Sequence, residues 1–135
     1  MNARPSRSPE AVRESAKRFV AEGASVAIDG RDEGKLLQAA KEIDPTGEHI
    51  IVSAGDIADP RVGAALVQAA VDRFGTLDVL VTNAGVFNPK ASREIDEREY
   101  DWYLDTILKG KFFTAQAAAK AMQAKGGVIV QTASM

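Results

Sequence analysis

Polar residues follow three of the apolar runs in this sequence, and their types suit the binding of a small polar ligand. They are Asp56-Ile57, Asn83-Ala84-Gly85 and Ser134. A carboxylate such as Asp56 can accept a hydrogen bond from an adenine amino group, and Gly85 lets a loop approach a ribose closely. If the apolar runs are parallel strands, these residues lie beyond the carboxyl ends, where open sheets bind ligands. On its own, however, Asn-Ala-Gly is more typical of a plain turn.

The sequence gives little support for a phosphate loop, a metal centre, or binding to nucleic acid or membranes. The Gly30-x-x-x-Gly34-Lys35 segment is one residue too short for a phosphate loop, and Leu36 stands where Ser or Thr would ligate magnesium. A single histidine, His49, and no cysteine argue against a metal centre. The lack of cysteine is compatible with a reducing cytoplasm, the location we expect. A net charge of -2 does not favour nucleic acid, and no apolar run approaches the ~20 residues of a membrane span.

Helical and apolar segments alternate along the chain, as a parallel sheet with crossover helices requires. Ser8-Pro9 is typical of a helix start and Gly23 of its end. Asp59-Pro60 and Gly75 bound another helix in the same way. Further helices are expected over 36–43 and, broken near Gly110, over 96–124, and strands over 26–28, 49–52, 78–81 and 128–130. The pattern predicts a polar tail at residues 1–8 and a doubly wound α/β domain over residues 9–135.

In order and spacing, these segments resemble the short-chain dehydrogenase/reductase family. The run 19–28 is similar to the family's first helix and second strand, and Asp56-Ile57 sits where the family contacts adenine. The run 78–85 resembles the fourth strand and its Asn-Asn-Ala-Gly signature, in which Thr82 replaces the first Asn. The runs 108–112 and 127–134 resemble the segment after the catalytic Asn and the fifth strand with its catalytic Ser, here Ser134. The resemblance implies a Rossmann-like sheet.

The same resemblance implies an oxidoreductase that moves hydride between NAD(P)(H) and a small carbonyl or alcohol. Asp56, Ile57, Asn83, Ala84 and Gly85 would then bind the cofactor. Gly30 occupies the position of the acid that holds a ribose diol, and Arg31 follows it. An Arg there can meet a 2′-phosphate, which favours NADP(H), although a solvated turn residue is an equally good interpretation. No nucleic acid or membrane partner is expected, and a homo-oligomer is possible.

Several family features are replaced or missing. The Gly-rich phosphate loop would fall on residues 5–12, which contain no glycine, and Ile107 stands where the family has its catalytic Asn. The first, central strand and the strands beyond Ser134 are absent, as is the Tyr-x-x-x-Lys pair that donates the proton. Without the central strand a gap of about two strand spacings opens, which can close up, be filled by another chain, or leave the product poorly folded.

Three interpretations follow. The chain is an incomplete and weakly active or inactive member of the family, a non-catalytic interaction module that pairs with a complete relative, or a truncated reading frame without a selected function. The long helix around 107–124, with its Ala-rich run 115–121, is where family members often associate.

Overall fold

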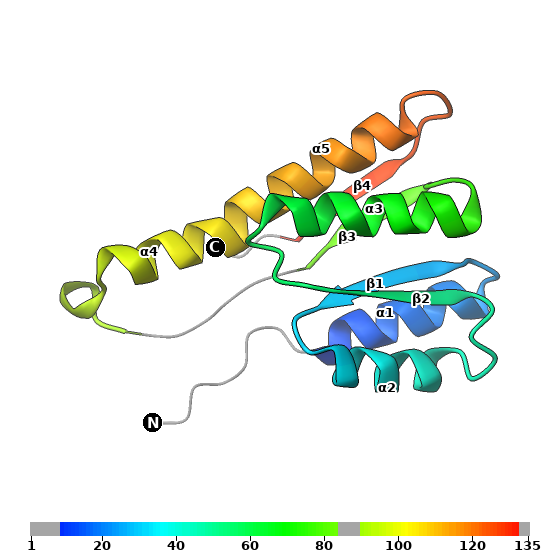
Figure 1. Ribbon diagram of the computed structural model, residues 1–135, viewed down its shortest axis with the longest axis horizontal. Coiled ribbons are helices and arrows are strands. Elements are labelled where there is room, and N and C mark those ends of the chain that lie inside the picture. The colour runs from blue at the N-terminus through cyan, green and yellow to red at the C-terminus, as the bar shows by residue number, and fades with distance from the viewer. Residues whose placement is uncertain (1–8, 84–89, 133–135) are drawn as a thin grey trace.

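The computed structural model describes residues 9–83 and 90–132, in which helices and strands alternate (Figure 1). The first half contains α1 (Pro9–Ala21), β1 (Val26–Gly30), α2 (Glu33–Ile43), β2 (Ile50–Ala54) and α3 (Pro60–Phe74). The second half contains β3 (Val79–Thr82), the 3-10 helix η1 (Ser92–Glu94), α4 (Glu97–Leu104), the π-helix η2 (Asp105–Lys109), α5 (Gly110–Met122) and β4 (Val128–Gln131). The predicted alternation is confirmed.

The strands form two separate parallel pairs. β1 pairs with β2, with Val26 opposite Ile50, and β3 pairs with β4, with Val79 opposite Val128. Within the described ranges no ladder joins β1 to β3, so the strands on either side of the expected central gap have not closed up. The α/β class and the incomplete Rossmann-like sheet are as predicted.

Helices hold the two sheets together. α1 and α2 pack on one face of the β1–β2 sheet, where Ala16, Ile28, Leu36, Ile43 and Ile50 form a buried core. α3 packs on the same two strands and also against α5, which in turn packs on β3 and β4. Figure 1 shows α3 and α5 side by side, on the opposite side of the strands from α1 and α2.

The predicted helix boundaries have clear local causes. Asp59 caps α3: its carboxylate accepts from the Arg61 backbone N–H at 2.9 Å and from the Arg61 guanidinium at 2.6 Å. These contacts lower the pKa of Asp59 to about 2, mainly through the hydrogen bond from the Arg61 side chain. Gly23 and Gly75, the predicted helix ends, have φ of 90° and 82°, a region that favours glycine. Pro9 opens α1 as expected, whereas Ser8 lies outside the described residues.

The long helical segment is interrupted by a π-helix directly before Gly110, close to the predicted break. One face of the segment is buried at every fourth residue: Thr106, Gly110, Thr114, Ala118 and Met122. Gly63 of α3 allows this face to approach closely, because a Cβ on Gly63 would overlap the Thr114 side chain. Gly63 thereby brings α3 and α5 close together.

No helix in the described part of the chain is both long and apolar enough to cross a membrane.

Candidate functional site

The ends of β3 and β4 are tied together by side chains that include a predicted cofactor-binding residue. The Thr132 hydroxyl lies 2.9 Å from Asn83 Oδ1 and 3.1 Å from the Thr82 carbonyl, and can donate to either. The Thr132 backbone N–H donates to the same carbonyl at 3.1 Å. Asn83 is thus held at the carboxyl edge of the sheet, where the strand pattern placed it.

Lys111, on the first turn of α5, adds a charge to this edge. Its ammonium group donates to the Thr132 carbonyl at 2.6 Å, and Gln131 Nε2 donates to the Lys111 carbonyl at 3.5 Å. Charge-assisted hydrogen bonds of this length are among the stronger ones in proteins. The sequence analysis gave Lys111 no role. The available signal was a cation four residues after Ile107, the position where the family carries its Asn, and hence on the same helix face.

The loop after β2 packs against Gly110, at the start of α5 and next to Lys111. A Cβ on Gly110 would overlap the Ile57 carbonyl oxygen and lie 3.0 Å from its carbon, so only glycine permits this approach. Asp56, beside it, is exposed, and its Oδ1 accepts from the Ala58 N–H at 3.0 Å. Contacts therefore connect the β2, β3 and β4 ends through Ile57, Gly110, Lys111 and Thr132.

Arg31 and Asp29 lie at the carboxyl end of β1. Arg31 is exposed and directly follows the strand. Asp29 is half-buried, and burial raises the pKa of its carboxyl, opposed by a hydrogen bond with its own backbone N–H. Of these two charged residues, Arg31 is the more exposed.

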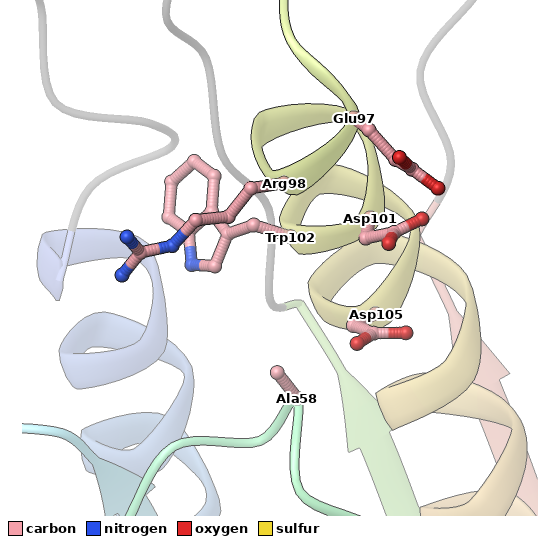
Figure 2. A pocket seen from close by; sticks show the side chains of 6 residues that line it. All are labelled: Ala58, Glu97, Arg98, Asp101, Trp102 and Asp105. Atoms are coloured by element: carbon pink, nitrogen blue, oxygen red, sulfur yellow. The ribbon is translucent and has the colours of Figure 1, made fainter.

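A shallow hollow of about 420 Å³ adjoins the site, between Ala58 and α4. Figure 2 shows Glu97, Asp101 and Asp105 on one side of it, and Arg98 beside the Trp102 ring on the other. The three carboxylates repeat every fourth residue along one helix face, and one of them pairs with Lys109 at 3.4 Å. A row of carboxylates of this kind repels phosphate groups, so this hollow is unsuited to the phosphates of a nucleotide.

The remaining predicted residues cannot be placed. Ala84, Gly85 and Ser134 lie outside the described residues. Ile107 lies in the π-helix, where its apolar side chain offers no hydrogen bond. Among the described residues, no group of three or more His, Cys, Asp or Glu side chains is arranged to hold a metal ion. The groups brought together are donors and acceptors, which suit binding a polar ligand.

Comparison with known proteins accounts for this arrangement. The family model for short chain dehydrogenases matches residues 12–135. The chain belongs to the short-chain dehydrogenase family. The resemblance inferred from the ordered motifs is confirmed.

The individual matches agree with the family. L-rhamnose 1-dehydrogenase (NAD(P)(+)) of Azotobacter vinelandii is 39% identical over 129 residues, which cover 91% of this chain and 50% of that enzyme. A solved structure of a putative short-chain alcohol dehydrogenase from Sinorhizobium meliloti superposes with a TM-score of 0.81 at 38% identity, covering 88% of this chain and 48% of that one. L-sorbose reductase of Gluconobacter frateurii, solved with NADPH and L-sorbose, superposes with the same score at 27% identity, covering 89% and 46%.

The chain thus spans about half the length of the short-chain dehydrogenases that it matches. Because 88% of it superposes on one relative at once, the two sheets and their helices are arranged as parts of a single dehydrogenase domain.

Proposed function

We propose that the chain binds the adenosine part of a nicotinamide dinucleotide at the carboxyl edge of its strands, and that its own hydride transfer is weak or absent. The observation that carries the proposal is the contact path from Ile57 through Gly110 and Lys111 to Thr132 and Asn83. Strand-end residues assembled in this way are typical of nucleotide-binding sheets. Ala84, Gly85 and Ser134 belong to the proposed site through the sequence alone.

The residues present fit the adenosine and the pyrophosphate parts of the dinucleotide unequally. The exposed Asp56 carboxylate can accept from the adenine amino group, and Arg31 can pair with a ribose 2′-phosphate, which supports NADP(H) over NAD(H). The pyrophosphate is disfavoured: Glu10 stands in the first turn of α1, where a negative charge opposes phosphate. We therefore propose weak binding, dominated by the adenosine end.

The substrate class proposed for the whole protein is a small carbonyl or alcohol. Relatives named for L-rhamnose and L-sorbose support a hydroxylated one. A cytoplasmic location remains part of this proposal.

Calorimetric titration of the purified chain with NADP⁺ and NAD⁺ tests the proposal. We expect NADP⁺ to bind more tightly, Arg31→Ala to remove that preference, and Asp56→Ala to weaken both ligands. Arg18→Ala, at an exposed arginine paired with Glu22 on α1, is the matched control and should change neither. A preference that survives Arg31→Ala would disprove the role of Arg31, and turnover of NADPH with a ketone would overturn the low activity.

A second candidate function is that of an interaction module, and one surface favours it. Tyr100, Leu104, Leu108 and Phe112 repeat every fourth residue along α4, η2 and α5 and are 41–65% exposed. A continuous apolar stripe of this kind is typical of a helix that packs against a partner. We propose a complete relative, or a second copy, as that partner.

Native mass measurement with and without a co-expressed complete relative distinguishes this candidate. Leu108→Glu should abolish a complex, whereas Leu37→Glu, at an exposed leucine of α2, should leave it intact. A monomer in every mixture would rule the interaction out.

A further inference from the structure

Thr132 directly follows β4 and bonds to β3 through both its main chain and its side chain. Its backbone N–H donates to the Thr82 carbonyl at 3.1 Å. Its hydroxyl lies 3.1 Å from the same carbonyl and 2.9 Å from Asn83 Oδ1. Its own carbonyl accepts from the Lys111 ammonium group at 2.6 Å. Contacts from β3 and from α5 therefore both fix the position of Thr132.

The Thr132 hydroxyl has one proton to donate and two acceptors within reach. The Thr82 carbonyl already receives the Thr132 N–H, and Asn83 Oδ1 is the closer of the two acceptors. A proton donated to Asn83 makes Oδ1 the atom of the amide that is held against Thr132. Because the other terminal atom of the amide is Nδ2, its two N–H groups are then the donors that Asn83 offers at the carboxyl edge of the sheet.

We infer that Thr132 is a positioning residue: its hydroxyl orients the Asn83 amide so that Asn83 donates hydrogen bonds to the nucleotide instead of accepting them. The inference rests on the proposed function, and it adds the chemistry of the ligand group that Asn83 meets. That group is a hydrogen-bond acceptor, such as a ribose oxygen or an adenine ring nitrogen.

Thr132→Val separates positioning from stability, because valine has nearly the shape of threonine but no hydroxyl. Valine also favours extended backbone, so the melting temperature should stay close to that of the parent. The dissociation constant for NADP⁺ should rise about three- to tenfold, as expected for one lost hydrogen bond. Thr132→Ser keeps the hydroxyl and should restore the affinity, although the lost methyl group lowers its melting temperature.

Thr46→Val is the matched control. The Thr46 hydroxyl donates to Asp44 at 2.6 Å in the loop before β2, at the opposite end of the strands from Asn83. Removal of this hydroxyl should lower the melting temperature and leave the affinity for NADP⁺ unchanged. The control therefore shows whether the loss of any buried hydroxyl contact is enough to weaken binding.

The side-chain amide of Asn83 provides a readout that needs no nucleotide. Its NMR signals can be identified by their loss in Asn83→Asp. They should be the same in Thr132→Ser as in the parent, but shifted and with a lower order parameter in Thr132→Val, because the amide loses the bond that holds it. When NADP⁺ is added to the parent, one of the two protons should move to lower field, as an N–H group does when it gains an acceptor.

Three results would overturn the inference. They are an unchanged affinity in Thr132→Val, an affinity that Thr132→Ser does not restore, and Asn83 amide signals that do not differ between Thr132→Val and the parent. Dissociation constants that follow the melting temperatures across all variants would likewise leave Thr132 with a structural role only. If the parent shows no binding of NADP⁺, the nucleotide proposal fails, and the Asn83 signals of the nucleotide-free proteins still decide whether Thr132 orients the amide.

Discussion

Among the described residues, the β1–β2 half of the chain has helices on both faces of its sheet, whereas the β3–β4 half has them on one face only. In the first half, Ile28 and Ile50 are 5% and 7% exposed beneath α1 and α2, and α3 lies on the opposite face. In the second half, Leu80 is buried towards α5, but the other face is open. The residues of this open face are the cross-strand pairs Val79–Val128 and Val81–Val130, which are 38–56% exposed.

This difference shows that an apolar composition alone does not guarantee burial of both faces of a strand. Both halves have valine- and isoleucine-rich strands, and the run 78–81 predicts a strand buried on both faces. The run is a strand, but Val79 and Val81 are exposed because no described helix covers them. Exposed apolar faces of this kind mark interaction surfaces or sites of self-association.

The largest expected change in stability comes from truncating one buried side chain in the core of each half. Ile28→Ala should lower the free energy of unfolding by about 2–5 kcal/mol, since it leaves a cavity in the core closed on both sides. Leu80→Ala should fall at the low end of that range, because the half-open sheet can relax around the missing atoms. Urea unfolding followed by circular dichroism measures both. An equal or larger loss for Leu80→Ala would contradict the difference between the halves.

The next prediction concerns the contact between the two halves, where Gly110 of α5 lies against Ile57 of the loop after β2. Gly110→Ala should cost about 1–3 kcal/mol, because its Cβ would overlap the backbone of Ile57 and push the β2 loop away from α5. Gly34→Ala on α2 is the matched control: its Cβ meets only the Asp32 side chain, at 3.4 Å, and alanine favours the helix. Thermal unfolding of both variants gives the comparison. A Gly110→Ala protein as stable as the control would show that the close approach is not needed.

Asp29, near the carboxyl end of β1, is expected to have a smaller, pH-dependent effect on stability. Burial raises the pKa of its carboxyl, so the folded state binds the proton more tightly than the unfolded state does. Its contribution to stability is therefore present at low pH and lost as the pH rises through the raised pKa. We expect Asp29→Asn to be more stable than the parent at pH 7, with the difference gone below pH 3.8, the ordinary value. Melting temperatures across this range test the sign, and a difference that persists below pH 3.8 would contradict it.

The smallest effect on stability is expected on the open valine face. Val79→Thr and Val128→Thr should change the free energy of unfolding by about 0.5 kcal/mol or less, because both side chains are already partly in water. The same variants should bind less of a hydrophobic dye and self-associate less. A stability loss well above that value would mean that something covers this face in solution.

Local patterns predicted most of the elements. The capping by Asp59-Pro60 and the ends at Gly23 and Gly75 depend on residues within one turn of each other, so they can be inferred from the sequence. The same is true of the break near Gly110. Asp56 and Asn83 were predicted at strand ends and are found there.

Features that depend on distant residues could not be found in this way. Lys111 meets Thr132 across 21 positions, and nothing in the local pattern around either residue predicts that contact. The need for glycine at positions 63 and 110 arises from residues on other elements.

The sequence by itself determined the family, the order of helices and strands, and which polar residues end the strands. These properties depend on residue type and short-range spacing, which the chain carries however it packs. The tertiary structure alone decided that the strands divide into two pairs, that Lys111 joins the candidate site, and that one sheet has an open face. Those outcomes depend on which surfaces are available to cover one another, and burial is a property of the packed molecule.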